Sequence, residues 1–172
     1  ADEASVSAAL KQLDTVAPLT KVVANAGVGG LAPVAAQDAD QYDDIMRTNV
    51  KGTLLVFKHA SRHLAQHGGG AMCAISSIAG LRTHPYMAAY CMSKAAIDML
   101  VRNCADELGG AGIRVNSVCP GLVETELASG LLNTEAVYQD YLACMPVARH
   151  GMVEDIAAAV AFLCNDSASW IT

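Results

Sequence analysis

Tyr90 and Lys94 are the residues of this chain whose types and spacing best suit catalysis. They lie at i and i+4, so a helix from Pro85 to Leu108 places both side chains on one face. A phenol ionises at about pH 10, and an ammonium one helical turn away favours the phenolate and lowers that pKa. A tyrosine tuned in this way is a competent general acid or base. The bare pattern also occurs by chance on solvated helices, so the surrounding motifs decide what it means.

Four further motifs flank the pair in a fixed order. Asn25-Ala26-Gly27 follows an apolar run, and Asn49 lies in an expected helix. Ser77 ends the pair Ser76-Ser77 before Ile78-Ala79-Gly80, and Pro120-Gly121 is followed by Thr125. Together with Tyr90-x-x-x-Lys94, these motifs resemble the short-chain dehydrogenase/reductase family in its single-domain form. The resemblance covers nearly the whole chain, and it rests on five motifs in register.

The resemblance implies a role for each matching residue. Tyr90 would exchange a proton with the substrate oxygen, while Lys94 would tune Tyr90 and hold the nicotinamide ribose. Ser77, rather than its rival Ser76, would hydrogen-bond the substrate oxygen, and the backbone carbonyl of Asn49 would hold a water of a proton relay. The implied cofactor is NAD or NADP, and the implied cofactor-binding residues are Asn25, Ala26, Gly27, Tyr90, Lys94, Pro120, Gly121, Val123 and Thr125.

The expected function is therefore an NAD(P)-dependent oxidoreductase that interconverts an alcohol and a carbonyl by hydride transfer. Two alternatives stay open. One is a relative of the sugar-nucleotide epimerases and dehydratases, which share the Tyr-x-x-x-Lys pattern, although the short region after the last expected strand argues against it. The other is a non-catalytic binding or scaffold protein, or a truncated product that competes for oligomer contacts.

Helical and strand patterns alternate along the chain, which is typical of parallel β-α-β units in a doubly wound sheet. The predicted strands are Lys21–Ala24, Ala71–Ser76 and Ile113–Cys119. The predicted helices are Glu3–Val16, Asp38–Gln66 with a bend near Gly52, Tyr86–Leu108, Glu135–Leu142 and Asp155–Cys164. The fold class is α/β, a partial Rossmann-type sheet that corresponds to strands four to six of the family with their flanking helices.

The glycine-rich turn that meets a pyrophosphate at a helix N-terminus has no good match. Gly27-Val28-Gly29-Gly30 is the nearest candidate, and a loop is its favoured interpretation because no helix opens directly behind it. We therefore expect residues 1–172 to be a single domain, the C-terminal part of a dinucleotide-binding fold and a fragment of a longer chain. Such a piece would bind nucleotide poorly and would leave one strand edge bare.

Composition excludes several classes of protein. The chain is 53% hydrophobic and 16% charged, which excludes disorder, and its net charge of −6 without a basic cluster argues against nucleic acid. No apolar run is long enough to span a membrane. The cysteines show no metal or redox spacing and indicate a reducing, cytoplasmic location. His59, His63 and His67 share a helix face without a completing ligand, so a solvated or interface stripe is favoured and no metal is expected.

Two further expectations concern partners. The region from Leu122 to Met145 is rich in apolar residues and favours an apolar alcohol or ketone as substrate. The resemblance implies a homo-dimer or homo-tetramer formed by the two long helices. Ala88, Ala89, Ala95 and Ala96 would permit close contact between helices.

Overall fold

A three-stranded parallel sheet forms the centre of the computed structural model, which describes residues 1–172. The strands are β1 (Lys21–Ala24), β2 (Gly70–Ile75) and β3 (Ile113–Val118), in the spatial order β1-β2-β3. In the register of the sheet, Val23 lies beside Cys73, and Cys73 lies beside Asn116. This arrangement confirms the predicted α/β class and the predicted strands to within one residue at each end.

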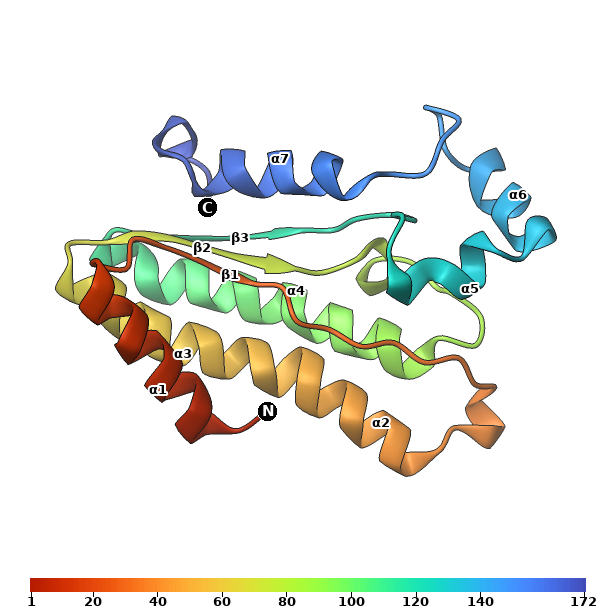
Figure 1. Cartoon of the computed structure of the whole chain (residues 1–172), viewed down its shortest axis with the longest axis horizontal. Helices are drawn as coiled ribbons and strands as arrows, with labels where there is room; N and C mark the ends of the chain where they lie inside the picture. Colours follow the sequence, from red (N-terminus) through yellow and green to blue (C-terminus); the bar gives the residue numbers. More distant parts are fainter.

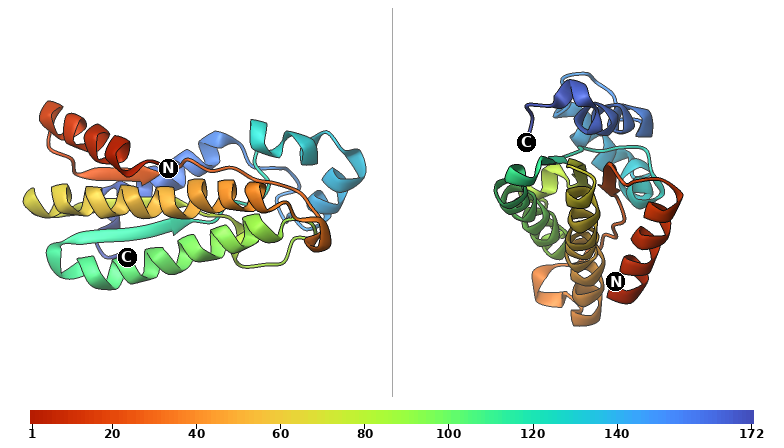
Figure 2. Two further views of the ribbon diagram at one scale, coloured as in Figure 1. Left: turned by 90° about the horizontal axis from the view of Figure 1, so that it is seen from below. Right: turned by 90° about the vertical axis from the view of Figure 1, so that its left-hand side faces the viewer.

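Helices cover the two faces of the sheet unequally (Figure 1). Figure 2 shows α1 (Glu3–Val16), α3 (Gly52–Gln66) and α4 (Ala88–Leu108) side by side under one face. The other face carries only α7 (Val153–Cys164). The short helices α5 (Ser129–Leu132) and α6 (Glu135–Ala143) lie beyond the carboxyl ends of the strands. That end of an open parallel sheet is where ligands bind.

The hydrophobic core is likewise larger on one face of the sheet than on the other. The larger cluster of twelve buried residues lies between the sheet and α1, α3 and α4, and Phe57, Leu64 and Ile97 are among its best-buried members. The cluster under α7 contains only three buried residues, Ala71, Cys73 and Cys164. Strand β2 is buried on both faces, which explains its continuous apolar sequence.

The predicted long helix from Asp38 to Gln66 is present from Ala39 onward, with a π-helical segment inside it. Asp38 caps α2 (Ala39–Ile45), a π-helical segment follows at Met46–Lys51, and α3 begins at Gly52. The irregularity expected near Gly52 is therefore a π-helical turn, which is wider than an α-helical turn and contains Asn49. π-Helical turns inside α-helices frequently accompany functional sites, and this one carries a predicted site residue.

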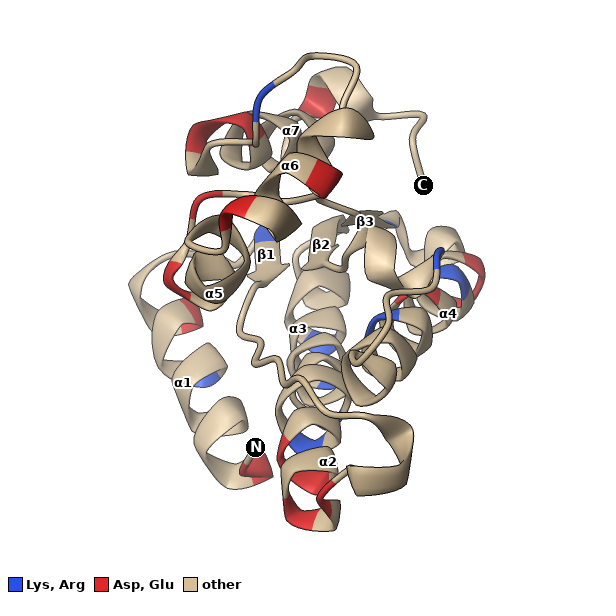
Figure 3. Ribbon diagram, turned by 90° about the vertical axis from the view of Figure 1, so that its right-hand side faces the viewer, with Lys and Arg blue, Asp and Glu red and all other residues tan.

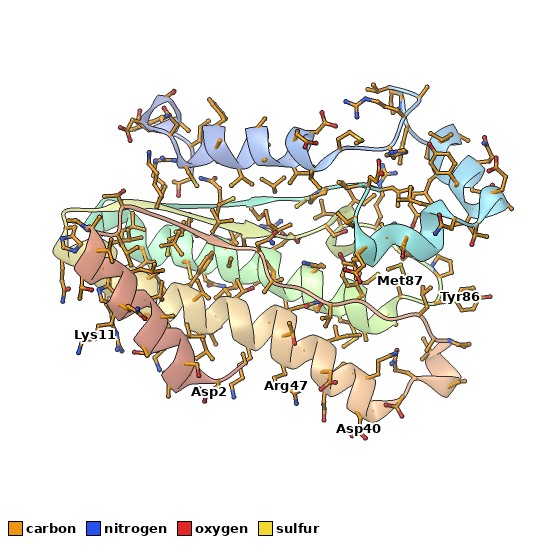
Figure 4. All side chains as sticks on the ribbon, viewed as in Figure 1. Asp2, Lys11, Asp40, Arg47, Tyr86 and Met87 are labelled. Atoms are coloured by element: carbon orange, nitrogen blue, oxygen red, sulfur yellow. The ribbon has the colours of Figure 1, made fainter.

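Helix α4 begins two residues later than predicted, because Tyr86 adopts a φ of 66° and Met87 is the N-cap. The Tyr86 carbonyl accepts a hydrogen bond from Ala32 N at 2.8 Å, which ties this turn to the loop after β1. Figure 4 shows the Tyr86 side chain pointing away from the molecule, and 64% of it is exposed. Pro85 therefore lies inside the turn from His84 to Met87 and does not open the helix.

Charged residues lie on the outside of several elements. Figure 3 shows Lys and Arg spread over different helices, while acidic residues gather on α2. All six cysteines are free thiols. None of the helices combines the length and apolar character that crossing a bilayer requires.

Candidate active site

Tyr90 and Lys94 lie on one face of the first turns of α4, as their spacing predicts. The Lys94 Nζ atom lies 5.5 Å from the centroid of the Tyr90 ring. Lys94 is only 4% exposed, and its ammonium donates a hydrogen bond to the Ile75 carbonyl at 2.8 Å. The last residue of β2 therefore fixes the position of the cation below the phenol.

Ser77 is the second residue after β2, and its hydroxyl accepts a hydrogen bond from Ala79 N at 3.1 Å. The Ser77 hydroxyl also lowers the pKa of the Tyr90 phenol, against the effect of burial. Ser76 is engaged differently, since its hydroxyl donates to the Lys94 backbone carbonyl at 3.2 Å. Ser76 thus anchors helix α4 to the strand end, and Ser77 is the hydroxyl beside the phenol.

Asn49 joins three segments around the site. Its side chain accepts from Val28 N at 2.8 Å and donates to Val28 O and to Ser93 Oγ, each at 2.9 Å. Ser93 in turn donates to the Tyr90 carbonyl at 2.7 Å. The Asn49 carbonyl accepts a hydrogen bond from Thr53 Oγ1 at 2.7 Å. Asn49 is fully buried and does not border the cleft described next.

A cleft of about 910 Å³ opens where the carboxyl ends of the strands meet α5, α6 and α7. The structure brings all of the predicted site residues except Asn49 into its lining. The predicted residues that line it are Asn25, Ala26, Gly27, Ser77, Tyr90, Lys94, Pro120, Gly121, Val123 and Thr125. The loop that contains Gly27 to Gly30 runs on without a helix behind it, so it lacks the helix N-terminus that would bind a pyrophosphate.

Burial controls the ionisation of the two central groups. Burial raises the pKa of the Tyr90 phenol, and the Ser77 hydroxyl opposes this rise. The net lowering that the sequence led us to expect is therefore wrong for this structure, because loss of solvation outweighs the stabilisation of the phenolate. Burial also lowers the pKa of Lys94 to about 8, against the opposing influence of Asp98 and Cys119. Lys94 is consequently charged at neutral pH, and Tyr90 is neutral.

Sequence reasoning missed two buried residues of this site. Ser93 links Asn49 to Tyr90, and Asp98 lies one turn beyond Lys94. Serine is a poor helix former, and a carboxylate at i+4 from the lysine shares its face. These two signals were available in the sequence, but only burial distinguishes such residues from solvated ones.

The apolar region from Leu122 to Met145 contributes only some of its residues to the cleft. Leu127, Leu131 and Tyr141 line it, and Tyr141 stacks on His84 with ring centroids 6.2 Å apart. Leu132, Val137, Leu142 and Met145 of the same region do not line it. Tyr138 contacts His150 at 2.9 Å, and His150 contacts Glu124 at 3.3 Å, so this region is tied back to the loop after β3.

The histidine stripe of α3 faces α1. His63 and His67 each contact an oxygen of Asp14 at 2.9 Å, and His59 contacts Glu3 at 3.0 Å. The stripe is thus an interface between two helices of the same chain, which agrees with the interface interpretation of its spacing.

The residues around Lys94 fit the nicotinamide and ribose half of NAD(P). A Cβ at Gly27 would lie 3.5 Å from Lys94 Nζ, so the Gly27 backbone lies close to the ammonium. The ammonium has three donors and uses one on Ile75, which leaves two for ribose hydroxyls. The small residues Ala26, Gly27 and Gly121 leave room for a flat ring.

Known proteins resemble this chain along its whole length. The family model described as enoyl-(acyl carrier protein) reductase matches residues 1–172. The 2-(S)-hydroxypropyl-CoM dehydrogenase 3 of Xanthobacter autotrophicus is 41% identical over 98% of this chain, which spans 68% of that protein. A short-chain type dehydrogenase/reductase from Mycobacterium ulcerans is 37% identical with a TM-score of 0.96, over 99% of this chain and 63% of the other. The chain thus spans about two thirds of these relatives.

Two other solved structures hold a nicotinamide cofactor. A gluconate 5-dehydrogenase from Burkholderia cenocepacia, in complex with NADP and tartrate, is 28% identical with a TM-score of 0.96 over 99% of this chain and 68% of its own. An NAD⁺-bound xylitol dehydrogenase is 29% identical with a TM-score of 0.91 over 99% of this chain and 72% of its own. The chain therefore belongs to the short-chain dehydrogenase/reductase family of oxidoreductases, whose cofactor is NAD or NADP.

Proposed function

We propose that the protein interconverts an alcohol and a carbonyl with NAD(P), and that Tyr90 is its proton donor and acceptor. The observation that carries this proposal is the meeting of Tyr90, Lys94 and Ser77 in one cleft at the carboxyl ends of the strands. The three residues come from α4 and from the end of β2, and burial of Lys94 keeps a cation fixed 5.5 Å from the phenol ring.

The residues of the chain divide the proton chemistry among them. In the direction of reduction, the neutral Tyr90 phenol donates its proton to the carbonyl oxygen while the Ser77 hydroxyl hydrogen-bonds the same oxygen. The Lys94 ammonium stabilises the phenolate that results. In the direction of oxidation, Tyr90 accepts the proton from the alcohol. Lys94 and the strand-end residues of β1 and β3 would hold the nicotinamide cofactor, which would supply or accept the hydride.

The substrate is proposed to be an uncharged and largely apolar alcohol or ketone. Met87, Leu127, Leu131 and Tyr141 supply the wall of the cleft that α4, α5 and α6 build around Tyr90. The residues that line the cleft include no Asp, Glu or Arg, and Lys94 is committed to Tyr90 and the ribose. An anionic group on the substrate would therefore find only His84 as a possible counter-charge.

A homo-dimer or homo-tetramer through α3 and α4 is also proposed. Leu54 on α3 and Met92 and Met99 on α4 are large apolar side chains that are about half exposed. Such residues on two neighbouring helices favour association with a second copy through this face.

The experiment that tests the function compares Tyr90→Phe with wild type in a panel of apolar alcohols and ketones, with nicotinamide absorbance as the readout. Loss of the proton donor should lower kcat about 100-fold or more, because general acid–base catalysis contributes at least that much. Tyr86→Phe is the matched control, since it removes the same hydroxyl from an exposed side chain. Full activity of Tyr90→Phe would rule out Tyr90 as the proton donor.

A further inference from the structure

One oxygen of the buried Asp98 carboxylate has no hydrogen-bond partner. Asp98 is 6% exposed and lies on α4, one turn beyond Lys94. Its Oδ1 atom accepts hydrogen bonds from Ser117 Oγ at 3.2 Å and from Cys119 Sγ at 3.6 Å. Its Oδ2 atom is buried without any partner, and no other buried side-chain nitrogen or oxygen of the chain is in this position. An unpartnered buried carboxylate oxygen is costly, so its place in the fold calls for an explanation.

The unpartnered oxygen lies against the turn of α4 that carries Lys94. A Cβ at Gly80 would meet Asp98 Oδ2 at 2.8 Å, and it would meet Lys94 C and Ala95 N at 2.9 Å each. The glycine therefore lets the segment after Ser77 close over both the carboxylate and the lysine backbone. The carboxylate is thus buried directly behind the catalytic face.

We propose that Asp98 is a positioning residue for catalysis, whose buried carboxylate keeps the Lys94 ammonium charged beneath Tyr90. The proposal rests on the proposed function of Tyr90 and Lys94 and adds a third member to their helix face. Asp98 acts through Lys94 and has no contact with the substrate.

The charges around Lys94 favour this role. Helix α4 packs against β3, the π-helical segment, the turn after Ser77, α2, α3 and the turn Gly109–Ala111. Asp98 on α4 and Cys119 directly after β3 are the ionisable groups that raise the pKa of Lys94, and the Tyr90 ring lies 5.5 Å from its Nζ atom. The ionisable side chains of the π-helical segment and of the turn after Ser77, Arg47, Lys51 and Arg82, are exposed. Asp98 is thus the one carboxylate that opposes the desolvation of Lys94, which already lowers the lysine pKa to about 8.

The first experiment measures Lys94 itself and needs no cofactor. The rate of acylation of Lys94 by acetic anhydride is followed by mass spectrometry as a function of pH, because only the neutral amine reacts. Asp98→Asn should move the midpoint down by about half a unit to one unit, since an opposite charge close by favours the ammonium. The control is Asp106→Asn, which removes the same charge from an exposed position of the same helix and should leave the midpoint in place. An unchanged midpoint in Asp98→Asn overturns the proposal.

The second experiment separates this role from a structural one. Asp98→Asn should keep or raise Tm, because a buried charge is removed. The pH at which kcat falls on the alkaline side should move down together with the Lys94 midpoint, while KM stays constant. A lower Tm with a uniform loss of kcat at every pH would mean that Asp98 only holds the fold, and would overturn the proposal. If Asp98→Asn does not fold, Asp98→Ser takes its place, since it lacks the charge and keeps a partner for Ser117. If wild type has no dehydrogenase activity, the proposed function fails while the acylation result still decides whether Asp98 controls Lys94.

Discussion

At the scale of single residues, burial of Lys94 has a measurable consequence for stability. An ammonium in water has an ordinary pKa of 10.5, and burial lowers that of Lys94 to about 8. The folded state therefore binds this proton more weakly than the unfolded state does. Below pH 8 the buried ammonium lowers the free energy of unfolding by its full amount. Between pH 8 and 10.5 this penalty disappears, because Lys94 has lost its proton in the folded state while the unfolded state still binds it.

Lys94→Met should therefore be more stable than wild type at pH 7, although it should be inactive. The shift of the lysine pKa corresponds to about 3 kcal/mol, and loss of the hydrogen bond to Ile75 offsets about 1 kcal/mol of it. Urea unfolding at several pH values would measure the gain, which should shrink as the pH rises from 8 to 10.5. A variant that is less stable than wild type at pH 7 would contradict this account of the site.

At the scale of elements, the turn after Ser77 and helix α4 are in unusually close contact. Gly80 lies where any side chain would meet Asp98 and the backbone of Lys94 and Ala95 at under 3.0 Å. The backbone of a helix cannot move aside as a flexible side chain can. The position of Ser77 relative to Tyr90 therefore depends on a residue that touches neither the substrate nor the cofactor.

Gly80→Ala should cost about 2 kcal/mol in the free energy of unfolding, because a packed site must open to admit the methyl group. It should also lower kcat through displacement of Ser77. Gly110→Ala is the matched control, since a Cβ there meets nothing within 4 Å. Chemical denaturation of the two variants gives the comparison, and equal free energies of unfolding would contradict a tight contact at Gly80.

Helix α1 contacts α3 through the Asp14 carboxylate, whose ionisation depends on pH. The Leu19 N–H and the imidazoles of His63 and His67 lower the pKa of Asp14 below 3.8. A carboxylate with a lowered pKa contributes stability above its unfolded pKa and loses it as the pH falls through the folded one. The contacts of Asp14 should therefore persist from neutral pH down to about pH 4 and fail below it.

Asp14→Asn should loosen α1 at neutral pH while it keeps an acceptor for Leu19. We expect amide hydrogen exchange in α1 to accelerate about two- to five-fold, because hydrogen bonds of the partly buried Asp14 carboxylate are lost, and exchange in α4 to stay constant. Asp140→Asn on α6 is the control, because this exposed residue lies on an element that does not touch α1. Equal exchange rates in the two variants would contradict a role for Asp14 in holding α1.

At the scale of the whole molecule, residues 1–172 form a sheet that is covered well on one face and sparsely on the other. Strand β1 has a neighbour on one side only, and Val23 on this strand is 43% exposed. The bare edge expected from the sequence is thus present. Unpaired strand edges with apolar side chains are sites of association between chains.

Residues 1–172 in isolation should therefore self-associate as their concentration rises, and Val23→Lys should reduce this, because an edge lysine blocks strand pairing. Val16→Lys is the control, since it makes the same change at an 83% exposed position at the end of α1. Light scattering over a range of concentrations measures the effect. Equal association of both variants with wild type would place the contact elsewhere.

The sequence by itself determined which elements form and which residues share a face. The apolar periodicity of α1 and of the strands predicted their bounds, and the i, i+4 spacing placed Tyr90 and Lys94 together because helix geometry is local. It also placed Ser77 at a strand end, which the order of the sheet then brought to the same edge.

Only the tertiary structure decided the ionisation of the site and the irregular backbone that supports it. Atoms from separate elements together raise the pKa of Tyr90 and leave one oxygen of Asp98 without a partner. The hydrogen bond between Asn49 and Val28 also joins separate elements. The left-handed backbone at Tyr86 is likewise supported by a hydrogen bond from the distant Ala32. Loss of solvation depends on everything that surrounds a group in space, and neighbours along the chain do not specify it.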